Sequence, residues 1–249
     1  MSKRLLLLVV VVFGVAVSAA GAGTRIGADS REFDPGRTFL VQAEWLRGIG
    51  CPTNARSANP NAAFTDWNGT YTPYTDPACP TGDRSDRRNE GLVLAKTGPT
   101  ENFASAVVDI RGVRGKTLTE LGYDIRKPGT TSGDPRGSWC GAGAPRFNIQ
   151  TKDDFYFLGC ASPPPTTQLD GHGFMRLTWG SPLMAYGSEG VLEPVTGKVK
   201  SLRIVFDEGT TAGGTELGFG LAVLDNINVN GKRVGQGGGG DDDDDDDDD

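Results

Sequence analysis

The pattern of apolar residues constrains the fold of this chain more than any other feature. Beyond residue 22, no helix-length segment repeats its apolar residues at a spacing of three or four. Instead, short segments alternate apolar and polar residues, as in Leu121-Gly-Tyr123-Asp-Ile125, and glycine- and proline-rich stretches separate them. Roughly nine or ten such segments predict an all-β chain folded as a single antiparallel β-sandwich. The expected strands cover residues 38–45, 91–96, 103–111, 117–127, 146–150, 155–160, 173–179, 199–206 and 219–230.

Residues 1–22 predict a secretory signal peptide. Lys3 and Arg4 precede an unbroken apolar run from Leu5 to Val17, and small residues follow it. The run is short for a bilayer whose hydrocarbon core is about 30 Å thick. We therefore expect cleavage after this segment, no membrane insertion of the mature chain, and a location outside the cell or in the cell envelope.

The rest of the chain divides by composition. Residues 23–37 are polar and are expected to be irregular, residues 38–235 form the sandwich domain, and residues 236–249 are a glycine spacer and a poly-aspartate tail. The nine aspartates of the tail contribute nine negative charges, which is more than the formal net charge of −7 of the whole chain. Because the body therefore carries no strong charge of either sign, we expect no nucleic-acid partner. The tail itself is expected to stay extended.

The four cysteines, Cys51, Cys79, Cys140 and Cys160, predict two disulfides if the protein enters an oxidising compartment. Three connectivities are possible. Sequential pairing is favoured because Cys140 and Cys160 enclose an expected hairpin, whereas Cys51 and Cys79 enclose a long polar loop. Each bridge is expected to contribute about 3 kcal/mol.

Asp225 is the most informative acidic residue of the expected core. At strand periodicity it shares a face with five apolar residues, Phe219, Leu221, Val223, Ile227 and Val229. A carboxylate on an apolar face loses hydration and needs a compensating partner. Three interpretations of Asp225 remain open. Backbone amides or an arginine satisfy the carboxylate, the carboxylate binds a structural Ca²⁺ ion, or it has a catalytic role.

The stretch Val223-Leu-Asp-Asn-Ile-Asn-Val-Asn-Gly231 resembles the closing strand of jelly-roll domains of the galactose-binding and carbohydrate-binding-module type. In those domains the acidic residue often supports a structural calcium ion or a loop, and Asp225 occupies that position here. The resemblance implies a jelly-roll-like sandwich with structural Ca²⁺. Asp207 and Glu208, which end an expected strand, are the further acids that we expect in a calcium-binding loop or a turn.

Three further segments carry a broader resemblance, namely Glu120-Leu-Gly-Tyr-Asp124, Cys140-Gly-Ala-Gly-Ala-Pro-Arg-Phe147 and Phe206-Asp-Glu-Gly-Thr210. Through them, residues 38–235 resemble secreted bacterial proteins to which no activity is assigned. This resemblance implies one coherent domain and no particular function.

The long loop before residue 91 carries the candidate ligand contacts. Trp67, Tyr71 and Tyr74 lie close together among small polar residues. Carbohydrate sites use flat aromatic faces together with a few polar groups that fix the orientation of the sugar. The alternative is that these rings fold inward as a small core for the loop.

These features favour a secreted, non-catalytic binding or cell-surface module, with a glycan or cell-surface polymer as its partner. An extracellular glycan hydrolase that uses Asp207, Glu208 or Asp225 is one alternative. A structural envelope or matrix protein with a cation-binding acidic tail is another. The only histidine, His172, lies in a glycine-flanked turn and is expected to be a solvent-exposed turn residue, not a catalytic base.

Overall fold

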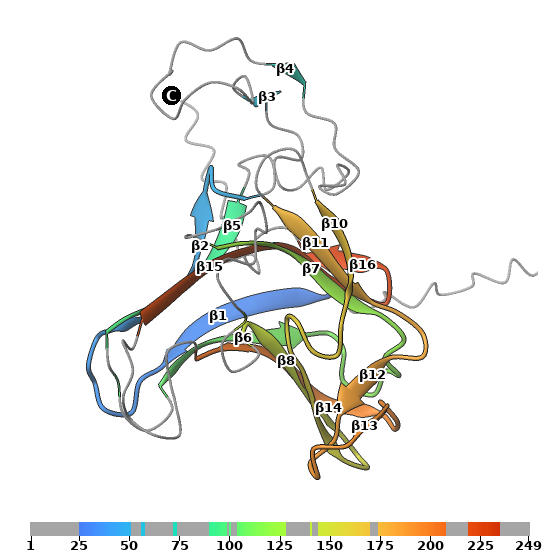
Figure 1. The fold of residues 1–249 in the computed structure, drawn as a ribbon. Coiled ribbons are helices and arrows are strands. Elements are labelled where there is room, and N and C mark those ends of the chain that lie inside the picture. The colour runs from blue at the N-terminus through green and yellow to red at the C-terminus, as the bar shows by residue number, and fades with distance from the viewer. Residues whose placement is uncertain are drawn as a thin grey trace, which may run out of the picture.

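The computed structural model describes residues 25–50, 56–57, 72–73, 90–98, 100, 104–127, 140, 144–169, 174–207 and 219–234. These residues form strands, turns and loops, and none of them is helical. Two seven-stranded antiparallel sheets form the two layers of a β-sandwich (Figure 1). The prediction of an all-β sandwich is therefore confirmed.

The strand order of the first sheet is β1-β6-β14-β8-β9-β12-β13. These strands are β1 (Gly27–Phe33), β6 (Ser105–Arg111), β14 (Val199–Phe206), β8 (Arg146–Thr151), β9 (Phe155–Leu158), β12 (Met184–Tyr186) and β13 (Leu192–Pro194).

The second sheet has the order β10-β11-β7-β15-β5-β2, and β16 pairs with β15. Its strands are β10 (Thr166–Leu169), β11 (Met175–Trp179), β7 (Leu121–Arg126), β15 (Phe219–Val229), β5 (Glu90–Thr97), β2 (Val41–Arg47) and β16 (Lys232–Val234). Two short strands, β3 (Arg56–Ser57) and β4 (Thr72–Pro73), pair only with each other.

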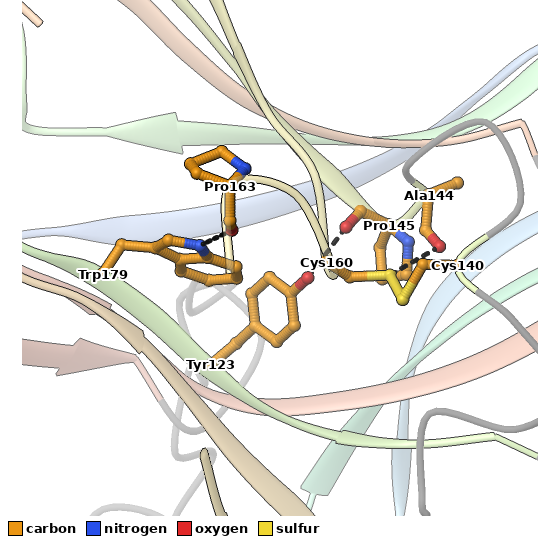
Figure 2. The surroundings of a disulfide bond; sticks show 7 residues. All are labelled: Tyr123, Cys140, Ala144, Pro145, Cys160, Pro163 and Trp179. Atoms are coloured by element: carbon orange, nitrogen blue, oxygen red, sulfur yellow. Dashed lines mark hydrogen bonds between the residues drawn. A yellow bond between two sulfur atoms is a disulfide. The ribbon is translucent and has the colours of Figure 1, made fainter. Parts of the chain in front are cut away.

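The hydrophobic core lies between the facing sides of the two sheets. Leu121, Tyr123 and Ile125 of β7 are fully buried there, as their alternation predicted. The Tyr123 ring packs against Phe147 of the opposite sheet, with ring centroids 5.5 Å apart. Its hydroxyl donates a hydrogen bond of 2.8 Å to the carbonyl of Pro145, which satisfies the one polar atom of this side chain (Figure 2).

β15 does not keep one face over its whole length, and the prediction that it would was wrong. Its register with β7 shifts between Asp225 and Asn228, and Asn226 adopts a φ of 44°. A β-bulge of this kind changes which residues face the core. The core residues of β15 are Ala222 and Leu224 before the bulge, and Ile227 and Val229 after it. Asp225 therefore lies on the outer side of the second sheet.

β1 lies in the segment that was expected to be irregular. It pairs with β6 from Gly27 opposite Arg111 to Phe33 opposite Ser105. Ala28 is its only buried residue, because β1 is an edge strand of its sheet. An edge strand with so little buried surface has no apolar alternation, which is why the sequence did not predict it.

The disulfide between Cys140 and Cys160 confirms the predicted pairing of these two residues, with a Cα–Cα distance of 5.8 Å. It encloses the hairpin of β8 and β9, whose pairing was also predicted. The bond lies close to Tyr123 and Pro145 (Figure 2). The second predicted bridge, between Cys51 and Cys79, lies outside the described residues.

Candidate functional site

The aromatic residues predicted to contact a ligand, Trp67, Tyr71 and Tyr74, lie outside the described residues, as does Glu208. The structure places the other two predicted acids, Asp225 and Asp207. Asp225 lies in β15 of the second sheet, whereas Asp207 directly follows β14 of the first sheet.

Asp225 is fully buried on the outer side of the second sheet. Its Oδ1 accepts a hydrogen bond of 2.6 Å from the backbone N–H of Asn226. The backbone at Gly50 lies over the same carboxylate, because a Cβ atom on Gly50 would come within 2.7 Å of Oδ2 and would clash with the Glu90 carbonyl oxygen. Only glycine fits this close approach.

Asp124 lies directly opposite Asp225 on the neighbouring strand and is also fully buried. Its Oδ2 accepts a hydrogen bond of 2.9 Å from the Asn226 side chain and lies 3.3 Å from Arg176 Nη1. Its Oδ1 has no hydrogen-bond partner among the described residues. Burial raises the pKa of Asp124 to about 6, although the charges of Arg176 and Arg233 and the hydrogen bond from Asn226 oppose this shift.

Asp207 follows β14 in the first sheet and is nearly buried. It forms a bidentate ion pair with Arg146, in which Nη1 donates to Oδ1 at 2.6 Å and Nη2 donates to Oδ2 at 2.7 Å. Neither this carboxylate nor Asp225 is open to a polymeric substrate in this structure. Across the part of the chain that the structure describes, no group of three or more histidine, cysteine or acidic side chains could hold a metal ion.

The outer side of the first sheet presents a row of seven residues, one from each strand and each in register with the next. In strand order they are Asp29, Asp109, Arg203, Asn148, Phe157, Tyr186 and Leu192. Residues in register share a face of the sheet. Their chain neighbours Ala28, Ile110 and Leu202 belong to the core, so the row faces outward.

One end of the row is apolar. We call it the aromatic end, and it consists of the row members Phe157, Tyr186 and Leu192 together with Phe155, which lies on the same face of β9. The rings of Phe155 and Phe157 lie with their centroids 4.8 Å apart. Phe157 is 37% exposed and Leu192 is 44% exposed. The Tyr186 hydroxyl shares a hydrogen bond of 3.0 Å with Ser162 Oγ. The aromatic end therefore joins exposed apolar surface with a fixed phenol group.

The other end of the row is charged. Arg203 belongs to the row, Arg31 lies two residues after Asp29 on the same face of β1, and both bind Asp109; we call Arg31 and Arg203 the arginine pair. Arg31 Nε donates to Asp109 Oδ2 and Arg203 Nε donates to Asp109 Oδ1, each at 2.6 Å. Partial burial would raise the pKa of Asp109, but the hydrogen bonds and charges of the two arginines outweigh this effect and lower it. Asp109 therefore stays ionised and holds both guanidinium groups in place.

Asn148 joins the two ends of the row. It lies in register with Arg203 on one side and Phe157 on the other. Its Oδ1 is buried and accepts no hydrogen bond within the described part of the chain. Asn148 therefore places a polar side chain between the charged end and the rings.

The sequence analysis did not identify this row as a site. One signal was present, because Phe155 and Phe157 flank the core residue Tyr156 in a strand and must therefore share the opposite face. The remaining members come from strands far apart in the sequence. Their register across the sheet is a property of the fold, so no local pattern could have assembled them.

Comparisons with protein-family models, with curated proteins and with solved structures gave no match to this chain. Within the described ranges, no helix is long and apolar enough to cross a membrane.

Proposed function

We propose that this protein is a secreted, non-catalytic binding module with a jelly-roll-like sandwich, and that the outer side of its first sheet binds carbohydrate. The observation that carries the proposal is the row from Arg203 to Leu192, where the exposed Phe157 ring and the half-buried Tyr186 ring lie in register with polar side chains. The chain also passes repeatedly between the two sheets, which is typical of jelly rolls.

The chemistry of the row suits a sugar chain. One face of a pyranose ring is rich in C–H groups and packs against an aromatic ring, while its hydroxyl groups need donors and acceptors. Neighbouring strands are about 4.8 Å apart, so the distance from Asn148 to Leu192 along the row is about 14 Å. That length accommodates a short oligosaccharide that lies across the strands.

We expect Phe157→Ala to weaken glycan binding about tenfold, equivalent to about 1.4 kcal/mol, because it removes the central ring of the aromatic end. The measurement is a screen against a glycan array followed by calorimetric titration with the best ligand. Phe33→Ala is the matched control, because Phe33 is similarly exposed, at 44%, but lies on β1 at the opposite edge of the sheet.

Equal loss of affinity in both variants would mean that the aromatic end has no special role. Retained affinity in Phe157→Ala, together with loss in Trp67→Ala, would move the site to the long loop, as the sequence first suggested.

A structural calcium ion at Asp225 remains part of the proposal. Thermal unfolding with excess Ca²⁺ and with chelator should show a higher Tm in calcium for the wild type and no difference for Asp225→Asn. Both proteins keep the acidic tail, so calcium bound there affects them equally. An identical calcium response in both would leave Asp225 as an acid that the protein alone satisfies.

A further inference from the structure

We infer that the carbohydrate is acidic, and that the arginine pair binds its carboxylate or sulfate group while the aromatic end packs against the sugar rings. This inference rests on the proposed function and specifies its ligand class. The evidence is the way in which the two arginines are held.

Asp109 fixes Arg31 and Arg203 through only one nitrogen each. Both contacts use Nε, and each takes a different carboxylate oxygen. Among the described residues, the terminal nitrogens of these two guanidinium groups have no partner. Arg146 contrasts with them, because both of its terminal nitrogens donate to Asp207.

Two guanidinium groups held in this way suit the recognition of an anion. The terminal nitrogens of an arginine donate in a planar fork that matches a carboxylate or sulfate group. Because Asp109 already orients both guanidinium groups, the two arginine side chains would lose less conformational entropy when a ligand binds. The side chains of Arg31 and Arg203 are 44% and 48% exposed, so an anion can reach them.

The local charge also favours an anionic ligand. The neighbouring pair of Arg111 and Asp29 is balanced. In the arginine pair, one carboxylate faces two guanidinium groups, so one positive charge remains uncompensated. Complementary charge of this kind both attracts a ligand and fixes its register on a surface.

The spacing joins the charged and aromatic ends into one site. Arg203 is two strands from Phe157 and three strands from Tyr186 in the same row. At about 4.8 Å for each strand, these distances are about 10 Å and about 14 Å. An acidic group and a ring two or three sugar units away can therefore bind at the same time.

The test uses uronate-bearing and sulfate-bearing oligosaccharides, each beside its neutral counterpart, the methyl ester or the desulfated form. Titrations of the full secreted chain at about 0.15 M salt limit repulsion from the acidic tail, because the Debye length is then about 8 Å. The variants are Arg31→Gln, Arg203→Gln and the double variant. Arg47→Gln is the control, since Arg47 is exposed but belongs to the second sheet.

We expect the wild type to bind one acidic oligosaccharide about tenfold more tightly than its neutral form. The double variant should lose this preference, and Arg47→Gln should keep it. Whichever acidic form is preferred identifies the bound group as carboxylate or sulfate. Circular dichroism of each variant establishes that it is folded.

Equal affinity for acidic and neutral forms, or a preference that survives in the double variant, would overturn the inference. Phe157→Ala separates it from the proposed function. If Phe157→Ala weakens binding of both forms while the arginine variants change nothing, the carbohydrate site stands and only the acidic ligand class is rejected. If no oligosaccharide binds the wild type, both are rejected.

Discussion

The protein should be more stable at pH 5 than at pH 7, because the buried Asp124 loses its proton at a higher pH in the folded state than in the unfolded chain. Burial raises the pKa of this carboxyl group from 3.8 to about 6. In the unfolded chain the group releases its proton near pH 3.8, so the folded state binds more protons between these two values. Stability therefore falls as the pH rises through this window, by up to about 3 kcal/mol in total, of which about 1.4 kcal/mol is lost between pH 5 and pH 7.

Urea unfolding at a series of pH values measures this effect, with a chelator present throughout. Asp124→Asn cannot titrate at this position, and its free energy of unfolding should lose the decline between pH 5 and pH 7. Asp109→Asn is a matched control on the other sheet. The pKa of Asp109 is lowered, so its contribution to stability is present above pH 3.8 and disappears only in stronger acid. A wild-type protein whose stability rises steadily from pH 5 to pH 7 would contradict the assignment.

The sequence predicted the elements that bury one clear face. The alternation in β7 and in the β8–β9 hairpin was correct because their core-facing residues are apolar at every second position. β1, β12 and β13 were missed because they are edge strands or short strands, and little of their surface is buried. The bulge at Asn226 was also missed, because a positive φ at an asparagine leaves no trace in apolar periodicity.

The candidate site was less predictable than the fold. Asp225 attracted notice because it interrupts a predicted apolar face. It is fully buried, but the bulge places it on the outer side of the sheet and not on the core face with Ile227 and Val229. The sequence paired it with Asp207 and Glu208, however, whereas the fold places Asp124 opposite it. Asp109 and its two arginines are separated by 78 and 94 positions along the chain. Contacts at such separations follow from strand order, which the sequence pattern alone does not specify.

Removing the disulfide through the double variant Cys140→Ala and Cys160→Ala should lower the free energy of unfolding by about 3 kcal/mol, because the 20-residue loop then gains entropy in the unfolded chain. For a domain of this size the Tm should fall by roughly 6–12 °C. The measurement is thermal and urea unfolding of the protein under oxidising conditions.

The bridge encloses the hairpin that carries Phe155 and Phe157, so the same variant also tests whether the site depends on it. Both rings are additionally held by the pairing of β9 with β8 and β12. If the aromatic end binds carbohydrate as proposed, the folded variant should bind it with nearly unchanged affinity below its Tm, with wild-type protein at the same temperature as the control. Loss of binding without loss of fold would mean that the bridge, and not the strand pairing, sets the position of the aromatic end. Unchanged stability would mean that the loop is already restricted in the unfolded chain.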